Sequence, residues 1–244
     1  MSDDKPAPTP VREAWRALVA DPRHGSMPSL LLVLTVVTGV VDAVSILSLG
    51  RVFVANMTGN VVFVGFALAG APGFSLSASL FALGGFLVGA AAGGVMANRR
   101  GEHRAALFRS GAAIELLLLV IAFVVAISAG APFGAVSRAA IAATVAVAMG
   151  MQNAVARQLA VPDLTTTVLT MTLTGLAADV RNTRWTRSAI IRITAVVSML
   201  IGAVAGALLV LRASPEAALA LAVGLLALVT AVSTWTARTQ RQRA

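Results

Sequence analysis

Six long apolar runs constrain this chain more than any other feature of its sequence. They lie at about 28–49, 75–97, 110–131, 138–160, 188–211 and 215–236. Each approaches or exceeds the roughly 20 residues that an α-helix needs to cross the hydrocarbon core of a bilayer. Hydrophobic residues make up 58% of the chain and charged residues only 12%, a composition outside the range of soluble domains. We therefore expect an all-α integral membrane protein with six transmembrane helices.

Two shorter and more polar segments follow the first and the fourth long run, at about 52–70 and 164–178. They carry amide and hydroxyl side chains that are unfavourable in contact with lipid. We expect each to be a broken helix, or a re-entrant segment that enters and leaves the membrane on one side. The sequence leaves open whether either segment crosses fully.

The second half of the sequence repeats parts of the first. Residues 39–44 read Gly-Val-Val-Asp-Ala-Val, and residues 150–155 read Gly-Met-Gln-Asn-Ala-Val. Duplicated membrane proteins with polar residues at matching places are typical of secondary transporters. The expected organisation is a tail at 1–27 with room for a short interfacial helix, one repeat at 28–131, a second at 138–236 and a basic tail at 237–244.

The positions of the arginines favour one topology. If only the six long runs cross, 16 of the 19 Lys and Arg residues lie on one side of the membrane, together with both termini. Lys and Arg are enriched in cytoplasmic loops, so this side is expected to be cytoplasmic. The two repeats then run in opposite directions, whereas eight full crossings would make them parallel. The net charge of +9 follows from these loops and does not indicate a nucleic-acid partner.

Asp42 is the strongest single indication of a functional site. It lies about eight residues, or roughly 12 Å, from the end of its apolar run and so close to the membrane midplane. Inverted symmetry is expected to bring Asn153, at the matching depth, toward it. A carboxylate at this depth costs about 2.5 to 3.5 kcal/mol and is usually retained near a cavity, a partner or a proton path. We hypothesise that Asp42 binds a proton or cation during transport; hydrogen bonding to the neighbouring polar segment is the alternative.

Other polar side chains in the two repeats are candidate ligands for a solute or ion. In the first polar segment a helix is expected to resume near Asn60, because asparagine caps helix N-termini well. The second segment offers threonine hydroxyls, which can instead bond to carbonyls of their own helix. Beside Asp42, the predicted ligands are Asn56, Thr58, Asn60, Gln152, Asn153, Thr167, Thr170 and Thr172.

Glycines spaced four residues apart predict close contacts between helices. Such spacing puts small residues on one helix face and allows two backbones to approach. The sequence does not tell whether the partner helix belongs to the same chain, so a homo-oligomer through these glycines stays open. The predicted packing residues are Gly85, Gly89 and Gly93 in the first repeat and Gly202 and Gly206, at matching places, in the second.

The residue types that catalyse reactions or bind metals are scarce. The chain has no cysteine, and its two histidines, His24 and His103, lie in arginine-bearing stretches outside the apolar runs. No nucleophile stands beside a base, and no phosphate-binding or dinucleotide motif occurs. We therefore expect no enzymatic activity, no metal and no cofactor. For Glu115, the other carboxylate deep in an apolar run, we expect an ion pair with Arg192, with a gating role as the alternative.

Three strings in combination are distinctive: residues 39–43 (Gly-Val-Val-Asp-Ala), 53–60 (Phe-Val-Ala-Asn-Met-Thr-Gly-Asn) and 150–154 (Gly-Met-Gln-Asn-Ala), the last followed by a Thr-rich segment. With them, the chain resembles the YoaK-type family of bacterial multi-spanning membrane proteins over about 30–236. That family is catalogued as a domain of unknown function, so the resemblance implies a membrane fold and no activity. Met171 stands where relatives commonly carry glycine, so a matching break in the second segment is not implied.

Taken together, these features favour a secondary transporter or permease in a bacterial plasma membrane. Its expected partners are the lipid bilayer, a small polar or anionic solute and a proton bound through Asp42. A channel would share the repeat but need no titratable residue, and a membrane scaffold would need neither. Flux driven by a solute gradient distinguishes the first two from the third.

Overall fold

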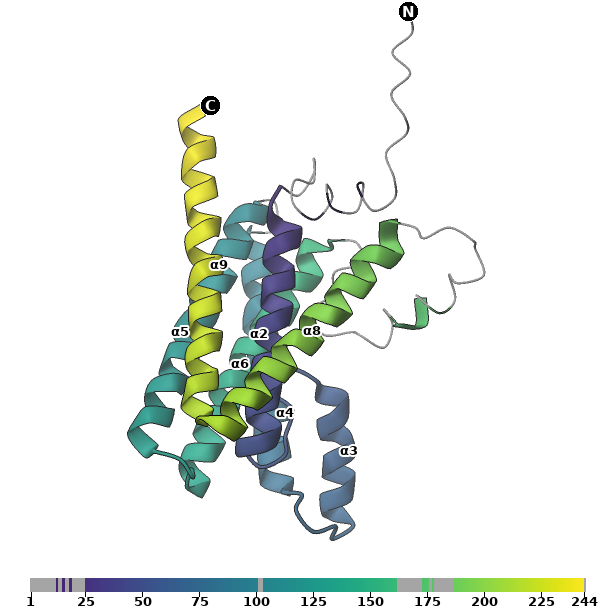
Figure 1. The fold of residues 1–244 in the computed structure, drawn as a ribbon, viewed down its shortest axis with the longest axis vertical. Coiled ribbons are helices and arrows are strands. Elements are labelled where there is room, and N and C mark those ends of the chain that lie inside the picture. Colours follow the sequence, from purple (N-terminus) through teal and green to yellow (C-terminus); the bar gives the residue numbers. More distant parts are fainter. Residues whose placement is uncertain are drawn as a thin grey trace, which may run out of the picture.

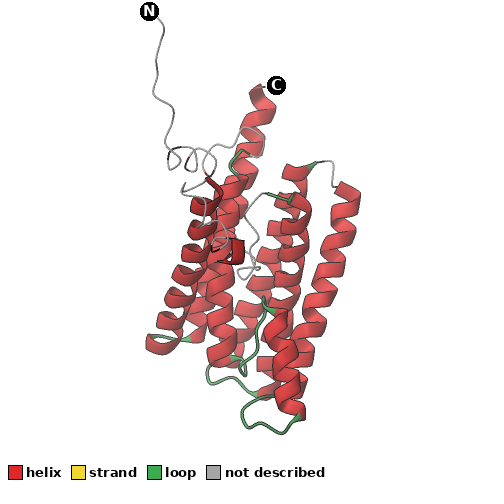
Figure 2. Cartoon of the chain, turned by 90° about the vertical axis from the view of Figure 1, so that its right-hand side faces the viewer, coloured by secondary structure: helices red, strands yellow, loops and turns green. Residues whose placement is uncertain are grey.

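The computed structural model describes residues 25–100, 103–161 and 187–243, together with positions 12, 15, 18, 173–175 and 177. The predicted ligands Thr167, Thr170 and Thr172, and nearly all of the second polar segment, lie outside the described residues. The described part is helical (Figure 2). Its elements are α2 (Met27–Ser48), α3 (Met57–Leu68), α4 (Leu76–Arg100), α5 (Arg104–Ala129), α6 (Ala135–Leu159), α8 (Arg187–Arg212) and α9 (Pro215–Arg243).

Six of these helices are long and apolar enough to cross a membrane, with mean hydropathies from 1.5 to 2.7 over their most apolar stretches. They are the six that the apolar runs predict, and the protein is an integral membrane protein. The largest differences in bounds are at α5, which begins six residues before its run, and α9, which continues seven residues beyond it. Both extensions carry arginines. These residues can be helical because a transmembrane helix can continue past the hydrocarbon core into the polar headgroup region.

Helices α2 and α6 form the centre of the bundle. Burial covers 67% of the most apolar stretch of α2 and 61% of that of α6, against 17% to 33% for the other four. The outer helices instead expose large apolar side chains, for example Leu87 of α4, Leu117 of α5 and Leu200 of α8. Such outward-facing residues suit contact with lipid, where they need no protein partner.

Each central helix packs against outer helices from the other half of the chain, and we call the contacts of α4 with α6 and of α8 with α2 the two crossed contacts. Helix α4 lies against α6, and α8 crosses α2 obliquely (Figure 1). Helix α5 contacts α6 and α9, while α9 also contacts α2. Helices α2 and α6 touch each other and run in opposite directions (Figure 1). Among the described helices, α2 therefore contacts only α6, α8 and α9, which all belong to the second half of the chain.

The predicted glycine faces make the two crossed contacts. A Cβ at Gly85 or Gly89 would collide with backbone carbonyls of α6, and one at Gly93 with the side chain of Ala154. On the other side, a Cβ at Gly202 or Gly206 would collide with the backbone of α2. The partner helices thus belong to the same chain, and these glycines are not available to bind a second copy. An oligomer would have to use another surface.

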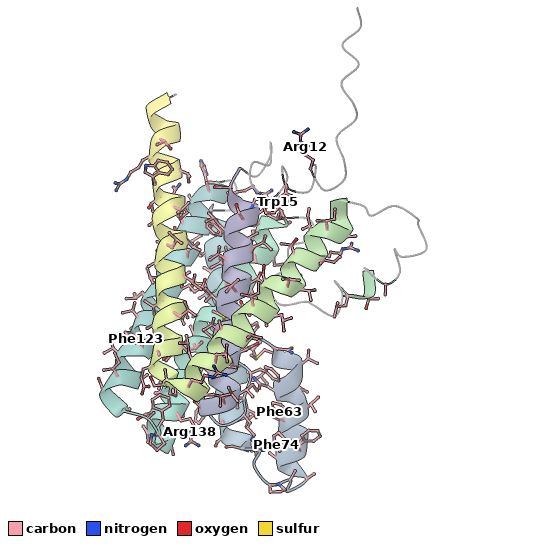
Figure 3. The ribbon with its side chains drawn as sticks, in the orientation of Figure 1. Arg12, Trp15, Phe63, Phe74, Phe123 and Arg138 are labelled. Carbon is pink, nitrogen blue, oxygen red and sulfur yellow. The ribbon has the colours of Figure 1, made fainter. Side chains whose placement is uncertain are left out.

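The ends of the helices carry the arginines unequally. Helix α2 begins, α4 ends, α5 begins, α6 ends, α8 begins and α9 ends at one end of the bundle (Figure 1). Arg99, Arg104, Arg157 and Arg238 lie near this end. Arg138 lies at the opposite end (Figure 3), where its side chain is close to Gly50, just after the end of α2.

The predicted polar segment at 52–70 forms a loop and a short helix. Residues 49–56 are not helical, and α3 has only 12 residues, or roughly 18 Å at 1.5 Å per residue. A helix of that length does not cross a core of about 30 Å. Helix α3 packs against α4, and Phe63, near its middle, stacks on Phe53 of the loop. Phe63 also contacts Phe74, which follows α3 (Figure 3).

Candidate functional site

The loop at 49–56 is the unusual element of the bundle. Its Val52, Val54 and Ala55 are buried, with exposed fractions of 4% or less. Backbone N–H and C=O groups inside a membrane protein need internal partners, because lipid offers none. A helix supplies these partners automatically, but an irregular loop must find them among side chains. Two side chains supply them here.

Asp42 supplies the first set of contacts. Its Oδ1 accepts hydrogen bonds from the backbone N–H groups of Val54, at 3.3 Å, and Ala55, at 3.2 Å. Asp42 lies six residues before the end of α2, so the loop folds back along α2 by roughly 9 Å. The side chain is 7% exposed. Charge-assisted hydrogen bonds of this kind are about twice as strong as neutral ones.

Asn60 supplies the second set. Its Oδ1 accepts from the N–H of Phe53 at 2.9 Å, and its Nδ2 donates to the carbonyl of the same residue at 2.6 Å. Nδ2 also approaches the Met57 sulfur at 3.5 Å. The amide thereby pairs with both backbone groups of Phe53, as a neighbouring β-strand would. We refer to Asp42 and Asn60 with the backbone that they hold as the loop clamp.

The expectation that a helix resumes near Asn60 is wrong by three residues. Helix α3 begins at Met57, and Asn60 lies inside its first turn with a fully buried side chain. Asn56 occupies the N-cap position but makes no capping hydrogen bond through its side chain. Gly59 is needed for a different reason than unwinding, because a Cβ there would enter the ring of Phe53. Asn56 and Thr58 are exposed beside the loop clamp.

Asp42 and Asn153, which inverted symmetry is expected to bring toward one site, make hydrogen bonds to different groups. Asp42 binds the loop backbone, whereas Asn153 on α6 donates from Nδ2 to the carbonyl of Met149 at 2.9 Å. The polar contact between the two central helices lies one turn away. There, Nε2 of Gln152 on α6 donates to Oγ1 of Thr38 on α2 at 3.1 Å.

Thr38 was not among the predicted ligands, although the sequence held a signal for it. It precedes Asp42 by four residues and therefore lies on the same face of α2. Its hydroxyl donates to the carbonyl of Leu34 at 2.9 Å, and its oxygen accepts from Gln152. Threonine commonly bonds its own helix in this way, so the sequence alone gives no sign of the second, interhelical bond.

Comparison with known proteins places the chain in a family. The model of a family described as "Protein of unknown function (DUF1275)" matches residues 30–232. The chain belongs to the DUF1275 family. It is also similar to the UPF0700 transmembrane protein YoaK of Bacillus subtilis (strain 168), with 31% identity over 190 residues, which cover 74% of this chain and 82% of that protein. No solved structure matches the chain.

The residues that the DUF1275 model matches include the loop clamp and the contact between Thr38 and Gln152. The family match and the similarity to YoaK confirm the resemblance to the YoaK-type family. Neither the family description nor the name of the relative assigns an activity. Within the described ranges of this DUF1275 chain, no three His, Cys, Asp or Glu residues come together in a way that could hold a metal ion.

Glu115 does not pair with Arg192. Glu115 lies on α5 and Arg192 on α8, and these two helices make no contact in the described part of the chain. Glu115 is instead 1% exposed, and its Oε1 has no hydrogen-bond partner there. It lines a small pocket with Gln152, next to α2. The sequence misled here because similar depth in the membrane does not tell which helices are neighbours.

Proposed function

We propose that this DUF1275 protein is a secondary transporter for a small polar or anionic solute, with the solute site at the loop clamp. The observation that carries the proposal is the non-helical backbone at 49–56, folded back along α2 and held by Asp42 and Asn60. Irregular backbone at membrane depth is tolerated only inside protein or beside a water-filled cavity. Discontinuous helices near the midplane form the substrate sites of many transporters.

The proposal includes two inverted halves, in which the polar segment of the first is re-entrant. Its support is the correspondence between the two crossed contacts. The backbone at Gly39 approaches Met199 and Ala203 of α8, and that at Gly150 approaches Phe86 and Ala90 of α4. Gly39 and Gly150 begin the two repeated strings, and Phe86 and Ala90 occupy the places in the first repeat that Met199 and Ala203 occupy in the second. Equivalent residues of the two repeats therefore make equivalent contacts.

The direction of α3 favours an anionic or carbonyl-bearing solute. Helix α3 begins at Met57, directly after the clamped residues, so the positive end of its dipole is next to the loop. The exposed Asn56 and Thr58 lie at this same end and offer an amide and a hydroxyl. Asn56 and Thr58 thus form a polar surface beside the non-helical backbone of the loop at 49–56.

Asp42 would couple transport to protons through the loop. A carboxylate accepts the two N–H bonds of Val54 and Ala55 more strongly than a neutral acid does. Protonation of Asp42 therefore weakens the clamp, and deprotonation restores it. The loop would then alternate between held and released positions as Asp42 binds and releases one proton.

The transport proposal can be tested in two steps. Small polar and anionic solutes are first screened by thermal shift, since a ligand at 100 times its dissociation constant stabilises by about 2.7 kcal/mol. Uptake of each stabilising solute is then measured in proteoliposomes with and without a pH gradient. We expect wild-type uptake to respond to the gradient and Asp42→Asn uptake not to respond. Uptake by Asp42→Asn that keeps its full response would refute the coupling, and uptake no faster than in empty liposomes would refute transport.

A further inference from the structure

A second buried carboxylate lies in the centre of the bundle, away from the loop clamp. Glu115 lies near the middle of α5, which runs from Arg104 to Ala129. Only 1% of its surface is exposed, and its Oε1 accepts no hydrogen bond from the described residues. A buried carboxylate that is ionised and unpaired loses several kcal/mol of hydration without compensation.

Among the described residues, the lining of the pocket around Glu115 offers no charge to compensate it. Glu115 and Gln152 line a pocket together with apolar or small residues, namely Leu31 and Leu34 of α2, Phe108, Gly111 and Ala112 of α5, and Val155 and Ala156 of α6. The space inside is about that of one water molecule. Other charged residues of α5 and of the helices that pack against it do not line the pocket: Arg104 and Arg109 of α5, Arg99 of α4, Arg138 and Arg157 of α6, and Glu216 and Arg238 of α9.

Gln152 presents an acceptor to the same pocket. Its Oε1 is buried and has no hydrogen-bond partner among the described residues. The orientation of its amide follows from Thr38, whose hydroxyl proton is already donated to the carbonyl of Leu34. The Thr38 oxygen can then only accept, so the Gln152 group that meets it must be the Nε2 donor. A flipped amide would place two acceptors against each other.

As far as the described residues go, the pocket thus brings together two oxygen acceptors without a donor. One proton on the carboxyl group of Glu115 resolves the problem, because it removes the charge and supplies an O–H donor. From the geometry of Glu115, Gln152 and Thr38 we infer that this pocket is a proton-binding site, in which the Glu115 carboxyl shares its proton with Gln152 Oε1 directly or through one water. Loading forms the O–H bond on Glu115, and release returns the proton to water; no other bond changes.

In the loaded state this site would be linked to α2 by hydrogen bonds. Gln152 on α6 already donates to Thr38 on α2, whose hydroxyl donates to the Leu34 carbonyl, and the proton on Glu115 would add the missing bond to Gln152. Loss of the proton turns Glu115 into a strong acceptor that competes with Thr38 for the Nε2 donor of Gln152. The contact between the two central helices therefore depends on whether Glu115 is loaded. The site is separate from the loop clamp and does not require that the protein transports a solute.

Infrared difference spectroscopy of the purified full-length protein tests the site, with H₂O and D₂O as the exchange probe. A protonated carboxyl group has a C=O band that is distinct from the carboxylate bands. We expect this band to disappear as the pH is raised, to shift in D₂O and to be absent in Glu115→Gln. The matched control is Glu216→Gln, which removes a carboxylate near the helix end and should leave the band unchanged.

A second variant keeps the test decisive if Glu115→Gln does not fold. Gln152→Leu leaves the carboxyl group in place but removes its acceptor, so the band should persist and move to higher wavenumber, as for a carboxyl group without a hydrogen bond. A band that neither titrates nor exchanges would show a permanently held proton and overturn the site. Absence of the band from a folded protein at every pH, including low pH, would show a carboxylate that stays ionised and overturn the site as well, whatever the outcome of the transport assay.

Discussion

The side-chain amide of Asn60 pairs with both backbone groups of Phe53, accepting from its N–H at 2.9 Å and donating to its carbonyl at 2.6 Å. This contact gives an irregular loop the hydrogen bonds that a β-sheet would otherwise supply. Only an uncharged amide carries a donor and an acceptor in this arrangement. Asn60 therefore stabilises the loop through hydrogen bonds that a carboxylate in its place could not make.

Asn60→Asp should destabilise the protein, because aspartate keeps the shape but replaces the Nδ2 donor with an acceptor facing the Phe53 carbonyl. An unsatisfied buried group costs about 1 to 3 kcal/mol. Thermal unfolding in detergent measures the change. The matched control is Asn56→Asp, at the N-cap of α3, where the side chain is exposed and makes no capping bond. Equal effects in the two variants would contradict the role of the clamp.

Release of the loop should be visible as chemical accessibility. The chain contains no cysteine, so a single cysteine can be placed at Val54, whose side chain is fully buried. In Val54→Cys, maleimide labelling should be slow, and adding Asp42→Ala should speed it about tenfold or more, because two charge-assisted bonds worth about 1.5 to 3 kcal/mol each are lost. Asp42→Asn retains an acceptor and should give a smaller increase. Unchanged labelling in Asp42→Ala would show that Asp42 does not hold the loop.

Gly89→Ala should weaken the contact between α4 and α6. The new methyl group would meet the Val147 carbonyl, and overpacking of this kind costs about 1 to 3 kcal/mol. Gly84→Ala, on the same helix, is the matched control because no atom lies within 4 Å of its Cβ position. That variant should be neutral or slightly stabilising, since alanine favours helices over glycine by up to about 1 kcal/mol. Thermal unfolding of both variants makes the comparison, and equal stability would contradict the close contact.

The bond between Thr38 and Gln152 can be measured by a double-mutant cycle. Thr38→Val and Gln152→Met keep the volumes similar and remove the interhelical hydrogen bond. Interhelical hydrogen bonds in membrane proteins average about 0.6 kcal/mol and reach about 1.7. We expect a coupling energy in this range from unfolding measurements. The same cycle with Thr35→Val should give no coupling, because the Thr35 hydroxyl bonds only the Leu31 carbonyl of its own helix.

Much of the fold is already determined by local properties of the sequence. Six apolar runs of sufficient length predict six helices, because a bilayer leaves few other ways to satisfy the backbone. The four-residue spacing of Gly85, Gly89 and Gly93 predicts a close helix contact, because small residues on one face let two backbones approach. The partner of that contact is not encoded locally, and it proved to be α6 of the same chain.

The candidate site was harder to predict, because its contacts depend on how a loop folds back. Asp42 and Asn60 were identified as polar residues at membrane depth, but their partners are backbone groups of Phe53, Val54 and Ala55, which have no side-chain signature. An ion pair between Glu115 and Arg192 is what similar depth in the membrane predicts, and that prediction is wrong. The depth of a residue in the membrane follows from its position along its helix. Which residues lie beside it depends on how the helices are rotated and packed, which a single sequence does not reveal.

The crossed packing of α2 has a consequence for biosynthesis. All described helical partners of α2 begin at residue 135 or later, and its main crossing partner, α8, begins at Arg187. A nascent chain inserted from its N-terminus would therefore hold Thr38 in the bilayer before its partner Gln152 on α6 has been synthesised. Among the described helices, neither half of the sequence contains the partners of its own central helix, so neither half can complete its helix packing without the other.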